Sequence, residues 1–103
     1  MHRAVLLLMY DLPAVSSDEK KELSKFRRNI KILGFVPMQE SIYVKLLRHY
    51  SNVKIEVERV ESIKPSNGLV QVLPLYLAEF KRLNTVTGDG FDTSLFSDDI
   101  VVL

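Results

Sequence analysis

The sequence predicts an α+β fold, and three patterns of apolar residues predict it. Residues 3–10 form a short, continuously apolar run, which is typical of a strand buried on both faces of a sheet. Residues 17–33 place apolar side chains at spacings of three and four, which is the period of a helix that buries one face. Within residues 35–47 the period changes to two, as in a half-buried strand: Ile42, Val44 and Leu46 alternate with Ser41, Tyr43 and Lys45.

The helix expected at 17–33 carries signals for both of its ends. The segment from Ser16 to Glu19 resembles a capping box, in which the hydroxyl of Ser16 and the carboxylate of Glu19 satisfy free amide groups. Gly34 follows the helix, and glycine readily adopts the left-handed conformation that ends one. The apolar stripe between these ends consists of Leu23, Phe26, Ile30 and Leu33.

Two further strands are expected on either side of the middle of the chain. Pro37 cannot donate a hydrogen bond to a sheet, so within Phe35–Leu47 it predicts a short edge strand or a bulge before the regular strand. Residues 64–68 read Lys-Pro-Ser-Asn-Gly, which is a strong turn signal. Leu69–Leu75 then has the composition of a strand.

The segment between these strands, 51–63, fits two structures. Val53, Ile55 and Val57 alternate as they would in a strand. Val53, Val57 and Val60 would instead share one face of a helix. We prefer a helix, because the Ser-Asn pair at the start of the segment can cap it.

Residues 76–103 are expected to form a C-terminal extension that contacts a second subunit or a partner. A short helix at 76–83 and a glycine-containing loop at 84–97 lead to a terminal strand at 100–103. Four apolar residues at a chain end make a poor free edge, and pairing with a second copy would cover them. The expected assembly is therefore a homodimer.

In order, these elements read β-α-β-β-α-β, followed by the small addition and a last strand. This order predicts a ferredoxin-like α+β sandwich with an extra C-terminal strand. The length of 103 residues suits one domain with one core, so we expect a single domain over 1–103. The fold hosts many functions and does not decide among them.

Composition excludes several classes of protein. The chain has no cysteine, which excludes disulfide frameworks, thiolate metal sites and cysteine nucleophiles. No apolar stretch approaches the roughly 20 residues of a membrane-spanning helix, and Asp11 and Pro13 stand where a signal peptide would carry small residues. We therefore expect a cytoplasmic protein without membrane contact. The net charge of +1 gives no general indication of nucleic-acid binding.

Asp11, at the end of the first strand, has two interpretations. It can form a turn before Pro13, or it can be a catalytic carboxylate that holds Mg²⁺. Magnesium usually requires a further ligand, and apart from Glu40 no other acidic residue lies in or beside the first three strands. In a two-fold dimer with Asp11 near the axis, the second carboxylate would come from the partner subunit.

The first helix is basic on the side opposite its apolar stripe. Such an excess fits either a solvated helix face or a phosphate-binding surface. Arg27 and Arg28 are the best candidates, because guanidinium groups bind phosphates through two nitrogens. Lys31 lies on the same helix, and Lys45 and Arg48, at the end of the expected hairpin, could extend the surface. The basic residues are Lys20, Lys21, Lys25, Arg27, Arg28 and Lys31, against the acidic Asp18, Glu19 and Glu22.

Three segments of the chain together resemble one family. They are the apolar strand ending in MYDLP, the basic helix containing KFRRNIKILGF and the following QESIYVKLL. The combination is similar to the CRISPR-associated Cas2 family, and most similar to its longer type II members. The resemblance covers about residues 3–47 well and continues more loosely through KPSNGLVQVLPLYLAEF and the terminal DDIVVL.

The resemblance implies a homodimer whose C-terminal strands pair across the subunits. It also implies a role in CRISPR adaptation, in which the dimer bridges two dimers of the integrase subunit and lies along double-stranded prespacer DNA. Asp11 matches the strand-one aspartate of the family, which implies a Mg²⁺ ligand between the subunits and, in some members, phosphodiester hydrolysis. Arg27 and Arg28 match basic helix positions, which implies phosphate contacts.

Three functions then stand as alternatives. The first, which we rank highest, is an architectural DNA-binding subunit of spacer acquisition, because one metal between two flexible carboxylates is a sparse site. The second is a metal-dependent endonuclease that cleaves RNA or DNA with paired Asp11 side chains. The third is a toxin-like ribonuclease of the VapD type, which shares the small fold. The sequence leaves open whether the chain cleaves nucleic acid.

Overall fold

The computed structural model describes residues 2–96 of the chain. Its main elements are β1 (Ala4–Asp11), α1 (Ser17–Ile32), β2 (Val36–Gln39), β3 (Ile42–Leu47), α2 (Val53–Ser62) and β4 (Leu69–Tyr76). The 3-10 helix η1 (Tyr50–Asn52) precedes α2, and α3 (Leu77–Phe80) and the 3-10 helix η2 (Thr93–Phe96) follow β4. The predicted order β-α-β-β-α-β is confirmed. The terminal strand predicted at 100–103 lies outside the described residues.

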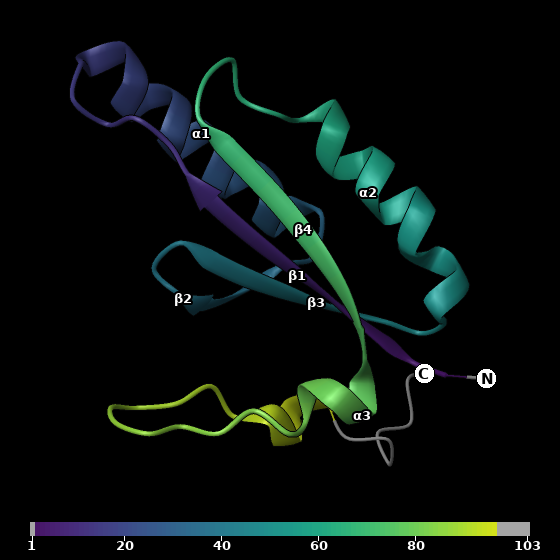
Figure 1. The fold of residues 1–103 in the computed structure, drawn as a ribbon. Coiled ribbons are helices and arrows are strands. Elements are labelled where there is room, and N and C mark those ends of the chain that lie inside the picture. The colour runs from purple at the N-terminus through teal and green to yellow at the C-terminus, as the bar shows by residue number, and fades with distance from the viewer. Residues whose placement is uncertain (1, 97–103) are drawn as a thin grey trace.

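The four strands form one antiparallel sheet in the order β2-β3-β1-β4 (Figure 1). The first strand of the chain is therefore central, between β3 and β4, which is the arrangement of a ferredoxin-like fold. The predicted fold class is confirmed. At the edge, the register between β2 and β3 shifts between Pro37 and Gln39, which is the irregularity that the proline predicted.

One face of the sheet packs against α1 and α2. Successive side chains of a strand point to opposite faces, so every second residue of β1, from Ala4 to Tyr10, enters this core. The two helices contribute residues from one stripe each, as the helical period required. The buried residues of this core are Ala4, Leu6, Leu8, Tyr10, Phe26, Ile30, Phe35, Tyr43, Leu47 and Val60.

The opposite face of the sheet is covered only at one end. There α3 and the segment after it pack on Val5 and Val44, and they lie at the end of the sheet where β4 leaves it (Figure 1). Toward the other end, Leu69 and Leu73 of β4 keep 54% and 46% of their surface exposed. The cross-strand register places a group of side chains on this uncovered part, which we call the open sheet face. It consists of Met9, Asp11, Ile42, Leu69, Gln71 and Leu73.

Both ends of α1 follow the sequence signals. The hydroxyl of Ser16 accepts a hydrogen bond from the amide of Glu19 at 3.1 Å, and the amide of Ser16 donates to the carboxylate of Glu19 at 2.8 Å. The predicted capping box is therefore confirmed. After the helix, Gly34 has a φ of 97°, the left-handed conformation that glycine adopts most readily.

The ambiguous segment 51–63 is helical, with its first residues in η1 and the rest in α2. Val53, Val57 and Val60 pack against the main core. Ile55, the residue that made the segment resemble a strand, is 52% exposed on the outer side of α2. The preference for a helix was correct because the three core positions fit its period and Ile55 does not contribute to burial. The expected cap is not formed, since Asn52, at the N-cap of α2, makes no side-chain capping hydrogen bond.

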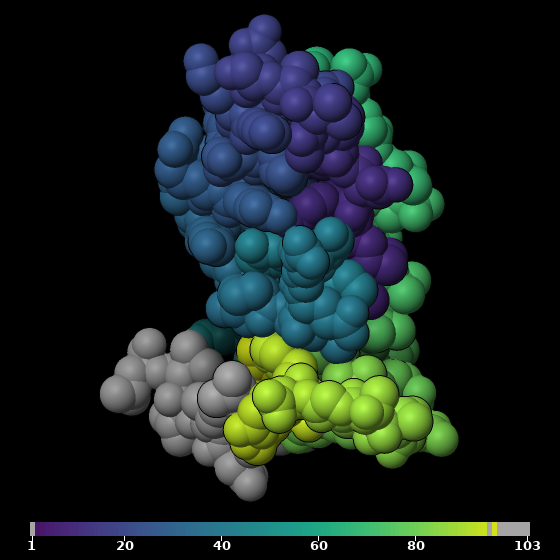
Figure 2. Space-filling view, turned by 90° about the vertical axis from the view of Figure 1, so that its left-hand side faces the viewer, coloured from purple at the N-terminus to yellow at the C-terminus, as the bar shows by residue number. Residues whose placement is uncertain are grey.

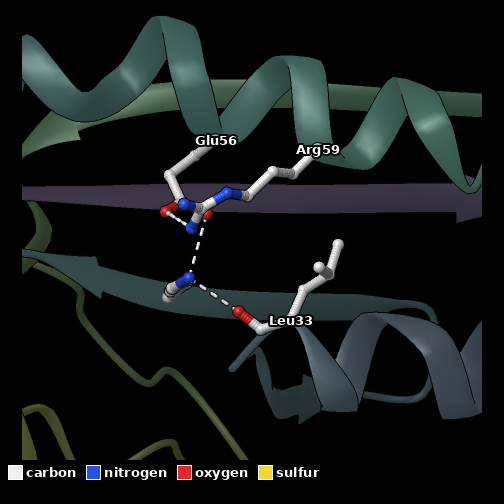
Figure 3. A network of polar contacts seen from close by, with 4 residues as sticks. Leu33, Glu56 and Arg59 are labelled. Atoms are coloured by element: carbon white, nitrogen blue, oxygen red, sulfur yellow. Dashed lines mark hydrogen bonds and ion pairs between the residues drawn. The ribbon is translucent and has the colours of Figure 1, made fainter.

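A polar network joins α2 to the sheet and to α1 (Figure 3). The carboxylate of Glu56, which is 6% exposed, pairs with Arg59 at 2.9 Å and with the ammonium of Lys45 at 2.9 Å. Lys45 also donates to the carbonyl of Leu33, just after α1, at 2.6 Å. The network compensates the cost of burying Glu56, since each of its oxygens has a cationic donor.

Within residues 2–96, no helix has the length and apolar character needed to cross a membrane.

Candidate nucleic-acid and metal site

Asp11 is the last residue of β1, and its position follows from the alternation of that strand. It is exposed, it pairs with Leu69 in the register of β4, and it lies on the open sheet face with Met9. In the described part of the chain, no hydrogen bond or ion pair occupies its carboxylate. The side chain is therefore available to a ligand on the uncovered face.

The carboxylate of Asp11 is a suitable ligand for Mg²⁺, but a magnesium site needs further ligands beside it. A carboxylate oxygen is the right kind of ligand for Mg²⁺, which is usually held by one or two carboxylates together with waters and phosphates. Residues 2–96 contain no group of three or more acidic or histidine side chains that could hold a metal ion. Glu40 lies near this end of the strand, because the amide of Tyr10 donates to the carbonyl of the next residue, Ser41, at 3.1 Å, and the hydroxyl of Tyr10 donates to the carbonyl of Glu40 at 3.1 Å. Asp11 thus fits Mg²⁺ as one member of a larger ligand set.

The basic residues of α1 are exposed apart from Arg27, which is half-buried. The helix lies at the surface of the molecule, in the violet to blue part of Figure 2. Its residues line two shallow depressions that share Ser24 and Arg28. Among the described residues, no carboxylate forms an ion pair with any of these cations. We call this region the α1 basic surface, and it consists of Lys20, Lys21, Lys25, Arg27, Arg28 and Lys31.

Arg27 differs from the other cations of the α1 basic surface because it is half-buried and fixed to the sheet. Its Nε donates a hydrogen bond to the hydroxyl of Tyr10 at 2.9 Å. That hydroxyl in turn donates to the carbonyl of Glu40. The hydrogen bond to Tyr10 is the main reason that the pKa of Arg27 lies above its ordinary value. Tyr10 itself is buried, with its ring edge-to-face on Phe26 at 5.4 Å between centroids.

The remaining predicted nucleic-acid ligands lie apart from this group. Lys45 has 19% of its side chain exposed, and its ammonium is used by Glu56 and Leu33. Arg48 follows β3 and is exposed. The structure therefore joins Arg27, Arg28 and Lys31 in one depression and gives Lys45 a role inside the protein. Nucleic-acid contacts by Lys45 and Arg48 stay predictions.

The link between Tyr10 and Arg27 is the part of the site that sequence reasoning missed. From the sequence, Tyr10 is one of several aromatic residues and Arg27 one of six cations. The positions of the two residues within their predicted strand and helix could have indicated this link. Alternation in β1 turns Tyr10 toward the helices. Arg27 is four residues from Leu23 and three from Ile30, so it lies at the edge of the apolar stripe.

Comparison with protein families identifies the chain. The model of a family described as CRISPR associated protein Cas2 matches residues 4–83. The chain belongs to the Cas2 family. The match spans β1 through α3, so it includes Asp11 and the whole α1 basic surface. The resemblance found in the sequence is confirmed.

Several curated relatives carry the name CRISPR-associated endoribonuclease Cas2. One from Ligilactobacillus salivarius is 35% identical over 83 residues, which cover 81% of this chain and 82% of the relative. One from Streptococcus mutans is 31% identical over 94 residues, covering 91% of this chain and 87% of the relative. One from Treponema denticola is 28% identical over 98 residues, covering 95% and 97%. Cas2 relatives thus match nearly the full length of the chain.

Proposed function

We propose that this Cas2 chain is an architectural subunit of CRISPR adaptation, the process of spacer acquisition. It would act as a homodimer that bridges dimers of the integrase subunit and binds double-stranded prespacer DNA. The observation that carries the proposal is the α1 basic surface: six cations on one helix, without a carboxylate partner in an ion pair among the described residues. Such a surface suits the phosphates of a duplex, which are contacted without regard to sequence.

The open sheet face supports the dimer. Leu69 and Leu73 are large apolar side chains that a monomer would leave in water, and Ile42 and Met9 lie beside them in the register. Two copies packed through this face would bury these side chains against each other, as two sheets do in a sandwich. Because α1 covers the other side of the sheet, this arrangement leaves the α1 basic surface of each copy free for DNA.

The dimer also bears on Asp11. Asp11 lies on the open sheet face. A two-fold axis that passes close to it would place the two Asp11 carboxylates opposite each other at the interface. The pair would supply the second carboxylate that one chain lacks. When bound there, Mg²⁺ would activate a water and stabilise negative charge on a phosphodiester.

Endonuclease activity is the second candidate function, and two observations favour it. The relatives in Ligilactobacillus salivarius and Treponema denticola are named endoribonucleases, and the carboxylate of Asp11 is free of other partners within residues 2–96. The chain would then cleave RNA, or DNA, with paired Asp11 side chains as metal ligands. The match to the Cas2 family disfavours the remaining alternative, a toxin-like ribonuclease of the VapD type.

An integration assay with the partner integrase separates the architectural from the nuclease function. We expect Asp11→Ala to leave integration of a prespacer intact while any Mg²⁺-dependent cleavage disappears, because the DNA contacts lie on α1. Asp18→Ala, which removes a carboxylate from the first turn of α1, serves as the matched control. Loss of integration by Asp11→Ala, with the dimer and the complex with the integrase intact, would contradict the architectural function.

A further inference from the structure

We propose that Tyr10 is a positioning residue. It holds the guanidinium of Arg27 in a fixed orientation on the α1 basic surface, so that the two terminal nitrogens can bind a phosphate together. The inference rests on the proposed binding of duplex DNA by α1 and deepens it. It assigns different roles to cations that the sequence presents as equivalent. Arg27 would be a preorganised ligand, whereas its neighbours Arg28 and Lys31 would be mobile charges.

The hydroxyl of Tyr10 is held in place from several sides. The ring is 7% exposed and contacts Phe26 and Tyr43, with centroid distances of 5.4 and 6.2 Å. The hydroxyl proton is used in the bond to the carbonyl of Glu40 at 3.1 Å. The oxygen is therefore left as an acceptor of fixed position and direction, aimed at α1.

Arg27 uses that acceptor in a way that leaves its phosphate-binding atoms available. Only Nε, the inner nitrogen, donates to Tyr10, at 2.9 Å. The two terminal nitrogens make no hydrogen bond to another described residue. A guanidinium is planar and rigid, so fixing Nε fixes the plane in which the terminal nitrogens present their donors. These donors match the spacing of two phosphate oxygens.

The surroundings of Arg27 favour an anion. Arg28 and Lys31 line the same shallow depression, together with Ser24 and Ile32. Glu40 is the acidic residue that acts electrostatically on Arg27, and it forms no ion pair with it. The net local charge is positive, and the depression opens to solvent.

Fixing one cation in advance has a physical advantage. A long side chain that is free in solution loses rotational freedom when it binds a ligand, and this loss opposes binding. Tyr10 would remove most of that loss for Arg27 before DNA arrives. The tyrosine hydroxyl thus contributes to affinity without contacting the nucleic acid.

A double-mutant cycle on duplex binding tests the proposal. Binding of a labelled duplex to the full chain is measured by fluorescence anisotropy for wild type, Tyr10→Phe, Arg27→Ala and the double variant. Tyr10→Phe removes one oxygen and keeps the packed ring, and we expect it to weaken binding about fivefold. In the Arg27→Ala background the same change should have no further effect. Tyr50→Phe, which removes the hydroxyl of an exposed tyrosine, is the matched control and should bind as wild type does.

The salt dependence gives a second readout, which separates the loss of a charge from the loss of its fixed orientation. Tyr10→Phe should lower the affinity and keep the slope of log affinity against log salt, because the number of charges is unchanged. Arg27→Ala should reduce that slope by about 0.9, the contribution of one phosphate contact. Arg27→Lys keeps the charge and loses the paired terminal nitrogens of the guanidinium. Like Tyr10→Phe, it should lower the affinity and keep the salt slope. This variant tests the proposal even if Tyr10→Phe fails to fold.

Three results would overturn the proposal. Equal weakening by Tyr10→Phe in both backgrounds would make Tyr10 a structural residue only. Wild-type affinity for Arg27→Lys would show that a positive charge at this position is enough for duplex binding, without the paired nitrogens of a guanidinium. Unchanged binding by both Arg27→Ala and Arg28→Ala would remove α1 from DNA binding, and with it the proposed function. The first two results leave that function standing, so the two failures can be told apart.

Discussion

At the scale of single residues, the structure separates cations that the sequence groups together. Lys45 and Arg27 were both expected to bind nucleic acid, and the structure gives each an intramolecular partner of a different kind. Lys45 pairs with the buried carboxylate of Glu56, so its charge compensates another charge inside the protein. Arg27 bonds to a neutral hydroxyl, so its positive charge remains available at the surface.

The role of Glu56 gives a prediction about stability. Glu56→Gln removes the charge that balances Lys45 and Arg59, and it leaves a partly buried ammonium with a weaker acceptor. We expect a loss of about 2 kcal/mol in the free energy of unfolding, below the value for a fully buried pair because both cations keep contact with water. Urea denaturation measures the change. Glu58→Gln, an exposed position on the same helix, should cost much less, and an equal cost would contradict the structural role of the network.

At the scale of elements, local signals predicted most of the structure. The capping box at Ser16, the glycine that ends α1 and the proline that disturbs β2 act through their immediate neighbours, so the sequence contains the necessary information. The segment 51–63 was ambiguous because Ile55, between Val53 and Val57, produces the alternation of a strand. Ile55 is exposed, and only the packing of α2 against the core distinguishes the helix from the strand. The Tyr10–Arg27 bond joins residues 17 positions apart on two elements, so it depends on how α1 docks on the sheet.

The capping box of α1 predicts a pH dependence of stability. Hydrogen bonds from the amides of Ser16 and Val15 hold the pKa of Glu19 below its ordinary value of 4.5. A carboxyl whose pKa is lowered by folding stabilises the folded state above its unfolded pKa, and the contribution is lost as the pH falls through the folded pKa. Wild type should therefore be more stable than Glu19→Gln at pH 7, and the difference should shrink below about pH 4.5.

Thermal unfolding from pH 7 to pH 3 measures this difference. Asp18→Asn, which removes a charge from the same turn and keeps the capping box, controls for the general preference of helix starts for negative charge. A difference between wild type and Glu19→Gln that stays constant over this range would contradict the assignment.

At the scale of the whole molecule, the two sides of the sheet differ in what covers them and in which residues they expose. The side covered by helices carries the α1 basic surface, and the open sheet face carries exposed apolar residues and Asp11. A dimer formed through the open sheet face would place the α1 basic surface of each copy on the outside and both copies of Asp11 at the interface. Sequence reasoning predicted the dimer from the terminal strand, whereas the open sheet face required the register of the strands.

The oligomeric state of surface variants tests whether the open sheet face is the dimer interface. Leu73→Glu places a charge on the open sheet face and should convert the dimer to a monomer, because burying an unpaired carboxylate is costly. Ile55→Glu is the matched control, since Ile55 is similarly exposed but lies on the outer side of α2. Sedimentation equilibrium distinguishes the two species. A dimer that survives Leu73→Glu would exclude this face as the interface.

The central claim, that α1 binds the phosphates of a duplex, is tested most directly by the salt dependence of DNA affinity. Charge reversal by Arg27→Glu together with Arg28→Glu is compared with reversal at two cations outside α1, Lys54→Glu with Arg82→Glu, which changes the net charge equally. We predict that the first pair weakens binding and flattens the slope of log affinity against log salt by about two, while the second pair changes the slope little. An unchanged slope for Arg27→Glu with Arg28→Glu would contradict the claim.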